Sequence, residues 1–500
     1  MTRTLFHDDV VFVFPAADFS AYAKYGATVI ASGGSHDSDY VNRLKRQGLH
    51  VAGTVWCLAA RSHDVHANPD LAAATAKDIE GNPIVVPWLP TNSPSEAPRY
   101  FGCVNHPVFR AHLRRTVCDA MEGGADGLHV DEPLGSSSAA LTLGGCFCDF
   151  CMAGFASYLA KQASDELLHT AKVGTFDAFD YRSFVKNYAP SREQYLSLQS
   201  AIPLHREFLD FQLTSACDNV VSLGRLAADV AGRPVSLSAN ACLPALEHAV
   251  IVPHLTYCAS EVAHNAAEGA QGLSQAVRAY SLAEALGKPM VATATAPDWS
   301  FVKEQNAEQL VCLWIALAYA CGQRFMVPHR MLCSAPGAPS QWYCGSVATF
   351  VPLYSFVKKH GFLLNEYVAV GPLAPPGLLP SSFETAAKRQ ALGAALAAHP
   401  AVPLGAGDKA WVFPRIRGDG AVAAHVVNLD YNVHSKRIAA QTGLEVRLPN
   451  ALFNRNFSRA TVYSYGGEPQ KIVVTNDGST SVFTLPELEL WSIVTFEYWA

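Results

Sequence analysis

The residues that could most clearly take part in a reaction are two adjacent acids at the end of an apolar run. Residues 123–133 read GGADGLHVDEP, so Asp131 and Glu132 end a short hydrophobic segment that the pattern predicts to be a strand. Acids at the end of a buried strand are costly unless they are paired, hydrogen-bonded or functional. Since neighbouring residues of a strand point to opposite faces, we expect one of them to face a site and the other to pair with a neighbour. Two loop carboxylates that cap the next segment are the alternative interpretation.

A third acid, Glu261, ends another apolar run, Tyr257-Cys-Ala-Ser-Glu261. Two carboxyl groups on either side of a glycosidic bond are the usual machinery of glycoside hydrolysis, one as acid/base and the other as nucleophile or base. We therefore expect Asp131 to be the nucleophile or charge stabiliser and Glu261 the acid/base. Glu132 is the rival catalytic acid.

Other polar and aromatic residues at predicted strand ends could line a sugar pocket, because aromatic faces and paired donors suit sugar rings and their hydroxyl groups. Taken singly, each is more often an ordinary loop residue. The predicted substrate-binding residues are Trp56, His129, Asn240, His264, Asp298, Trp299, His329 and Arg330, and weaker candidates are His36, Asp37, Arg61 and His63.

Cysteines form a second cluster, one that could bind a metal ion. Cys146, Cys148 and Cys151 make a C-x-C-x-x-C run, and Cys103 is the natural fourth donor, with His106 in reserve. Four thiolates can hold one tetrahedral Zn²⁺, so we expect a structural zinc; free thiols are the alternative. A closed four-cysteine site leaves no position for water, which argues against a zinc-dependent hydrolase.

The elements that must position these residues alternate between short apolar runs and amphipathic segments, as in a parallel βαβ sheet. Eight such runs suit a closed (β/α)8 TIM barrel of the α/β class better than a doubly wound sheet, since no G-x-G-x-x-G turn follows the first run. A long insertion of about 133–230 follows the fourth. The predicted strands are Val10–Phe14, Thr28–Ala31, His50–Trp56, Gly127–Asp131, Val235–Ala239, Leu255–Ser260, Met290–Thr295 and Phe325–Pro328.

The pattern changes near residue 371. We assign 1–370 to the barrel, the Pro/Gly-rich 371–380 to a linker and 381–500 to a C-terminal all-β domain, similar to a sandwich, that is structural or binds carbohydrate. Its predicted strands are Ala410–Pro414, Ala421–Asn428, Glu445–Leu448, Thr461–Ser464, Lys471–Thr475, Ser481–Leu485 and Trp491–Glu497.

Composition excludes several classes of partner. Half of the 500 residues are hydrophobic, 16% are charged and the net charge is −6, which gives no general attraction for nucleic acid or an anionic membrane. The first residues lack a basic segment followed by an apolar one, so we expect a cytoplasmic protein without a membrane anchor. P-loop, G-x-S-x-G and H-E-x-x-H motifs are absent. Carbohydrate is the expected partner, and a homo-oligomer is left open.

One stretch resembles a known family. Cys103-Val-Asn-His-Pro-Val-Phe-Arg, the strand ending in Asp131-Glu132, and the cysteine run leading into Gly154-Phe-Ala-Ser-Tyr-Leu159 are similar to family 42 β-galactosidases over about sixty residues. The resemblance implies that the four cysteines bind a structural zinc and that Glu132 is the acid/base. That family places its nucleophilic Glu at the end of strand seven, where this chain has only Asp298.

An acid on strand four with a partner on strand six instead resembles the α-galactosidase clan. The sequence therefore predicts a glycoside hydrolase that acts on an oligosaccharide or glycoconjugate, with retention of configuration. The alternative, favoured by the missing strand-seven Glu, is a barrel that binds carbohydrate without hydrolysing it.

Overall fold

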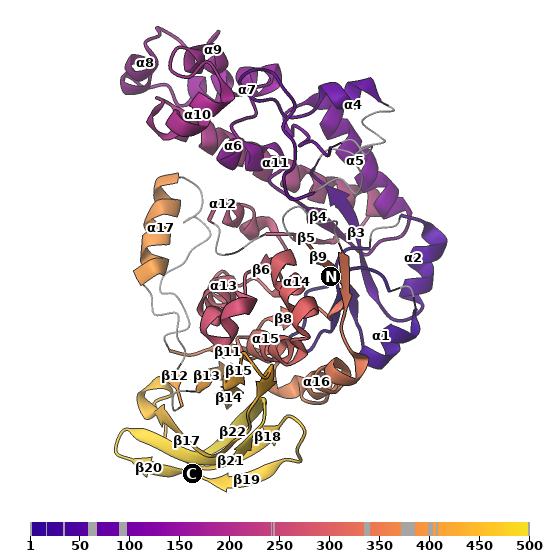
Figure 1. Ribbon diagram of the computed structural model, residues 1–500, viewed down its shortest axis with the longest axis vertical. Helices are drawn as coiled ribbons and strands as arrows, with labels where there is room; N and C mark the ends of the chain where they lie inside the picture. The colour runs from indigo at the N-terminus through magenta and orange to yellow at the C-terminus, as the bar shows by residue number, and fades with distance from the viewer. Residues whose placement is uncertain are drawn as a thin grey trace.

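The computed structural model describes residues 3–16, 18–33, 36–58, 68–89, 98–241, 243, 246–334, 341–371, 386–398, 404–406 and 409–498. Its first part is an eight-stranded parallel sheet whose strands follow one another in chain order (Figure 1). The Val327 amide donates to the Val11 carbonyl at 2.8 Å and brings the chain after the last strand back to the first. The strands are β1 (Val11–Phe12), β2 (Val29–Ile30), β3 (His50–Trp56), β4 (Gly127–Asp131), β5 (Ser236–Ala239), β6 (Tyr257–Val262), β7 (Met290–Ala294) and β8 (Arg324–Phe325).

This nearly closed barrel confirms the predicted fold class and every predicted barrel strand. Its strands are buried on both faces, which explains their continuous apolar runs. On β4, Leu128 and Val130 pack into the main hydrophobic core, while His129 bonds to the side chain of Ser238 on β5. The outer helices are α1 (Ser20–Tyr25), α2 (Ser38–Lys45), α5 (Pro107–Glu122), α11 (His205–Ala231), α13 (Ser274–Ala285), α14 (Ala296–Gln305), α15 (Glu308–Ala320) and α16 (Val347–Lys359).

Two insertions, and not one, build the lobe at the top of Figure 1. The first follows β3 and contains α4 (Pro69–Ala73). The second follows β4 and contains α6 (Ser136–Thr142), α7 (Asp149–Lys161), α8 (Asp165–Ala171), α9 (Tyr181–Lys186) and α10 (Arg192–Leu198). Ile84 and Phe101 of the first share one hydrophobic core with Phe147 and Phe155 of the second. The sequence predicted only the second, because the first has little regular secondary structure.

The C-terminal part contains the predicted strands. A larger antiparallel sheet runs in the order β11-β13-β14-β22-β18-β19, with β12 beside β13, and a smaller one runs β17-β21-β20. Val426 and Val494 of the larger sheet share a core with Val446 and Leu485 of the smaller one. The strands are β11 (Tyr367–Ala369), β12 (Leu404–Gly405), β13 (Ala410–Arg417), β14 (Val422–Asn428), β15 (Tyr431–Asn432), β16 (Arg437–Ile438), β17 (Gln441–Pro449), β18 (Phe457–Ser464), β19 (Gln470–Val473), β20 (Thr475–Asp477), β21 (Thr480–Leu488) and β22 (Trp491–Tyr498).

One helix, α17 (Ala386–Ala398), interrupts the segment that we predicted to be purely β. Its sequence, AAKRQALGAALAA, is rich in alanine and leucine, which have the highest helix propensities. Arg389 on this helix forms an ion pair with Asp210 of α11. The helix therefore belongs to the connection between the barrel and the β-domain and lies beside α12 (Leu246–Ala249) (Figure 1).

Helix α15 and one ion pair join the two parts. Every residue from Leu310 to Ala320 is buried, because α15 lies between the barrel and strand β14 of the β-domain. Arg415 of β13 donates to Glu284 of α13 at 2.6 Å and to the Tyr367 carbonyl at 2.8 Å. No described helix is long and apolar enough to cross a membrane.

Candidate active site

The side chains at the carboxyl ends of β3 to β6 form the candidate site. Trp56 is the register partner of Asp131 on the neighbouring strand. Because alternate residues of β4 face the barrel interior, Asp131 points to the same side as His129, whose imidazole bonds to Ser238 at 3.0 Å inside the barrel. Asp131 therefore stands one layer above His129, at the end of the barrel where active sites of this fold lie.

Asp131 is held by two N–H donors. Asn240, which follows β5, donates its side-chain amide to Oδ1 at 3.3 Å, and the Glu132 backbone amide donates to the same oxygen at 3.0 Å. Asn240 Oδ1 in turn accepts from the Glu261 backbone amide at 3.4 Å. These bonds connect the ends of β4, β5 and β6 and orient the Asp131 carboxyl group.

Glu132 does not continue the strand. Its φ is 48°, in the left-handed region that non-glycine residues rarely adopt. Burial, together with the charges of Asp131 and Glu261, raises the pKa of Glu132 to about 8. As expected, one acid of the pair bonds to a neighbour, since Glu132 accepts from the Trp88 indole; its direction, however, is set by the left-handed turn after Asp131 and not by strand alternation.

Glu261 lies on the same side of the barrel. It is on β6, as predicted, and its side chain is exposed. Burial within the surrounding protein and the charge of Asp131 nevertheless raise the pKa of Glu261 to about 7. A carboxyl group that solvent reaches while protein encloses most of its surroundings can bind a substrate and exchange a proton near neutral pH.

Three predicted substrate-binding residues lie in the core instead. His264 is fully buried, and its ring nitrogens bond to the Val262 carbonyl at 2.7 Å and the Tyr280 hydroxyl at 3.1 Å. The buried carboxylate of Asp298 accepts from the backbone amides of His264 at 3.0 Å and Ala266 at 2.8 Å. Trp299 is buried and donates to Thr293 at 3.1 Å. We no longer assign these three residues to the substrate site, since protein groups already satisfy their polar atoms.

His329 and Arg330 lie on the rim formed by the β8 and β1 loops. They begin β9 (His329–Cys333), which pairs with β10 (Gln341–Cys344). The His329 ring lies 5.5 Å from that of Phe12, and the Arg330 guanidinium lies over the Trp342 ring at 5.1 Å. Around the barrel, the β8 and β1 strands lie opposite β4. His329 and Arg330 could therefore contact only a part of the substrate that lies away from Asp131.

The weaker candidates have structural partners or lie outside the described residues. The His36 ring bonds to the Thr54 carbonyl at 3.2 Å, and Asp37 caps helix α2 by accepting from the Tyr40 amide at 3.0 Å. Arg61 and His63 lie outside the described residues.

Sequence reasoning missed two exposed tryptophans at the mouth, Trp88 and Trp342. The Trp88 indole donates to Oε1 of Glu132 at 3.2 Å. Trp88 is 42% exposed, as is Trp56, and Trp342 is 45% exposed. The available signal was that Trp88 lies in a Pro-rich stretch and Trp342 directly follows a Pro/Gly-rich one, since loops of this composition often carry ligand-binding residues.

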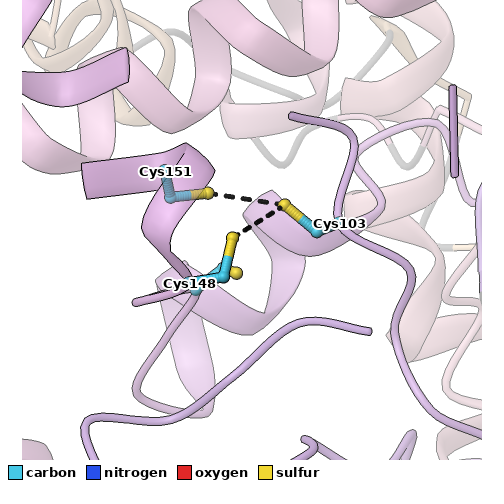
Figure 2. Close-up of side chains that lie close together, drawn as sticks. Cys103, Cys148 and Cys151 are labelled. Carbon is cyan, nitrogen blue, oxygen red and sulfur yellow. Dashed lines mark hydrogen bonds between the residues drawn. The ribbon is translucent and has the colours of Figure 1, made fainter. Parts of the chain in front are cut away.

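The four cysteines form a compact buried cluster, of which Figure 2 labels Cys103, Cys148 and Cys151. Cys103 Sγ lies 3.5 Å from the sulfurs of both Cys148 and Cys151, and all four Sγ atoms, including that of Cys146, lie within 4.8 Å of one another. Sulfurs bound tetrahedrally to zinc at about 2.3 Å are about 3.8 Å apart, so the residues fit such an ion. His106 instead caps helix α5.

Backbone and amide donors approach two of these sulfurs from the first insertion and the start of α5. The Lys77 amide donates to Cys146 Sγ at 3.4 Å, and the Asn105 side-chain amide donates to Cys151 Sγ at 3.4 Å. Such donors stabilise thiolates around a metal. The cluster also joins the two insertions, because Cys103 precedes β4 and the other three cysteines follow it.

Comparisons with known proteins find one curated relative and several solved structures of the same fold. No family model matches the chain. It is 22% identical to an α-agarase of Alteromonas agarilytica over 281 residues, which is 53% of this chain and 19% of the agarase. The chain thus spans less than a fifth of the length of that relative.

Two solved structures share the architecture. A cycloisomaltooligosaccharide glucanotransferase of Paenibacillus sp. matches 97% of this chain and 84% of its own, with a TM-score of 0.59 and 10% identity. An α-L-fucosidase of Paenibacillus thiaminolyticus matches 99% of this chain and 100% of its own, also with a TM-score of 0.59 and 10% identity. At these identities the likeness shows the fold.

Proposed function

We propose that the protein is a glycoside hydrolase that cleaves an O-glycosidic bond in an oligosaccharide or glycoconjugate. The observation that carries the proposal is the group of carboxyls at the ends of β4 and β6, where burial and then the Asp131 charge raise the pKa of both Glu132 and Glu261. The agarase, glucanotransferase and fucosidase that resemble this chain act on glycosidic bonds, which supports the same chemistry.

In the proposed reaction Asp131 attacks the anomeric carbon while Glu261 gives its proton to the leaving oxygen. Attack forms an Asp131–sugar ester and breaks the glycosidic bond; water then gives a proton to Glu261 and its oxygen to the anomeric carbon, which releases the sugar with retention. A pKa near 7 suits Glu261 for both proton transfers. The bonds from Asn240 and Glu132 to Asp131 Oδ1 would keep the nucleophile in position.

Glu132 is the alternative acid/base, as the resemblance to family 42 β-galactosidases implies. Its pKa, about 8, also suits a proton donor. Strand β7 has no acidic residue that could replace Asp131 as nucleophile, and Asp298, which follows it, is occupied by backbone amides. The pair Asp131 and Glu261 is therefore the first to test.

A structural zinc ion held by Cys103, Cys146, Cys148 and Cys151 is part of the proposal. With four protein ligands it would leave no site for water or substrate, so its contribution would be to stability. It would bind the two insertions together next to the mouth of the barrel.

A substrate screen tests the proposed function. Agarose oligosaccharides, isomalto-oligosaccharides and aryl glycosides of galactose, glucose and fucose should be incubated with the protein, and NMR should follow the anomer that is released first. Hydrolysis of one of them with retention is expected. Measurable binding of an oligosaccharide without any cleavage would instead favour a carbohydrate-binding barrel.

A further inference from the structure

Trp88 combines exposure with a contact to a carboxyl group of the candidate site. A large part of its ring faces solvent, although apolar side chains of this size are usually covered. Its indole N–H donates to Oε1 of Glu132 at 3.2 Å. Singly exposed apolar side chains are common, but this ring also bonds to a carboxyl group of the candidate site, where a bound sugar would meet it.

The chain around Trp88 holds the ring in place. The Leu89 amide donates to the Val86 carbonyl at 3.4 Å and closes a turn, and both of these residues pack into the core of the insertions. The Phe101 ring meets the Trp88 ring edge-on at 5.6 Å between centroids. Trp88 is therefore presented on an anchored turn, as a sugar-stacking residue requires.

The hydrogen bond from Trp88 also determines which oxygen of the Glu132 carboxyl is available to a ligand. Oε1 accepts from the indole, and among the described residues no other side chain bonds to either oxygen. If Glu132 is protonated, as burial and the neighbouring charges favour, its proton lies on Oε2, since Oε1 is the acceptor. Oε2 can then donate to a hydroxyl group of a bound molecule.

We infer that Trp88 and Glu132 form a sugar subsite next to the point of cleavage, on the leaving-group side, in which an uncharged pyranose ring packs on the indole and bonds through a hydroxyl to Glu132 Oε2. This inference rests on the proposed function and adds the class of sugar to it. An aromatic face binds the apolar C–H face of a pyranose, and the carboxyl bonds to a hydroxyl at its edge.

The charge of the site excludes acidic sugars from this position. Asp131, Glu132 and Glu261 lie close enough for their charges to interact. A sugar carboxylate or sulfate would add a negative charge beside Asp131, which costs free energy in a partly desolvated site even while Glu132 and Glu261 are protonated. A neutral ring fits the same space without this cost.

The test measures the activity of each variant on two substrates. The disaccharide and the methyl glycoside of the sugar that the screen identifies both need protonation of the leaving oxygen, but only the disaccharide offers a ring to Trp88. Trp88→Ala should lower kcat/KM for the disaccharide about tenfold and leave that for the methyl glycoside unchanged. Phe362→Ala, which removes an exposed ring that contacts Tyr463 of the β-domain, is the matched control. Equal losses on both substrates, or none, would overturn the subsite.

A binding measurement separates this inference from the proposed function. If the wild-type protein hydrolyses nothing in the screen, calorimetry with the same neutral oligosaccharides is used. Weaker binding by Trp88→Ala, about tenfold, supports the subsite even when hydrolysis is absent. Unchanged binding by the variant, or no binding of any oligosaccharide by the wild-type protein, overturns it. Trp88→Phe keeps a ring but loses the N–H, so in this variant ¹³C NMR should show an even higher pKa for Glu132, because the lost bond lowers it.

Discussion

Asn240 joins Asp131 to the strand that carries Glu261. Its amide nitrogen donates to Asp131 Oδ1, and its amide oxygen accepts from the Glu261 backbone amide. One side chain thus sets the distance between the ends of β4 and β6. The sequence predicts Asn240 as a substrate-binding residue; because its side chain bonds to protein groups at both ends, we propose that it positions Asp131.

Replacing Asn240 should disturb the nucleophile and leave the fold intact. Asn240→Ala removes one of two donors to Asp131, so we expect kcat to fall about 10- to 100-fold with little change in KM. The pH profile should also shift, which a merely structural effect on folding would not cause. Steady-state kinetics between pH 5 and 9 check this. An unchanged kcat would show that Asn240 does not position Asp131.

Loss of either proposed catalytic acid should abolish hydrolysis. Asp131→Asn and Glu261→Gln should each lower kcat by a factor of about 10³ or more while the melting temperature stays close to that of the wild type. Glu487→Gln, on an exposed position of β21, is the control for removal of an acid. Near-normal activity of Glu261→Gln would move the acid/base role to Glu132.

Activity should decline as the solution becomes alkaline. Glu261 must carry a proton to donate it, and its pKa is about 7. We therefore expect kcat/KM to fall as pH rises through about 7, with an alkaline limb that disappears for substrates whose leaving groups need no protonation. A profile that stays flat up to pH 9 for an alkyl glycoside would contradict the assignment.

The stability of the protein should depend on Glu132 in a definite direction. The pKa of this group is raised from an ordinary value of 4.5 to about 8, so the folded protein keeps a proton that the unfolded chain has released. Its contribution to stability is complete below about pH 4.5 and is lost as pH rises through about 8. Glu132→Gln, always neutral, should therefore melt at a higher temperature than the wild type at pH 9, while the difference at pH 4 is smaller. Scanning calorimetry at both pH values measures this.

The cysteine cluster should contain one zinc ion per chain. Elemental analysis of protein purified without chelator should find it, and chelation or Cys148→Ser should lower the melting temperature. Replacement of Cys118, a cysteine outside the cluster, by Ser serves as the control. Purified protein with no zinc would contradict the proposal and leave four free thiols.

The barrel could be predicted from the sequence because its strands are buried on both faces and read as continuous apolar runs. The same reading placed Asp131 and Glu261 on strands four and six, and it found the cysteines by their spacing. These are local signals, each contained within a few residues. The insertion after β3 left no such signal, since its core is shared with residues that follow β4.

Burial and backbone turns of single residues could not be predicted. His264, Asp298 and Trp299 stand at strand ends like true site residues, but they are buried in the core, where hydrogen bonds to other protein groups satisfy their polar atoms. Glu132 reaches the site because the chain takes a left-handed turn directly after the strand. Helical and strand periodicity contain no information about such a turn.

The separation of Trp88 from the acids has an evolutionary consequence. Asp131 and Glu261 belong to the barrel strands, whereas Trp88 comes from an inserted segment held by the core that it shares with the insertion after β4 and by the cysteine cluster. Deletions, duplications and exchanges of that segment can therefore change which sugar is accepted while the bond-breaking groups stay where they are. Relatives with different substrates should differ first between β3 and α5. A laboratory graft of this stretch together with the insertion after β4, whose core and cysteine cluster it shares, offers a route to new substrates that keeps the barrel strands.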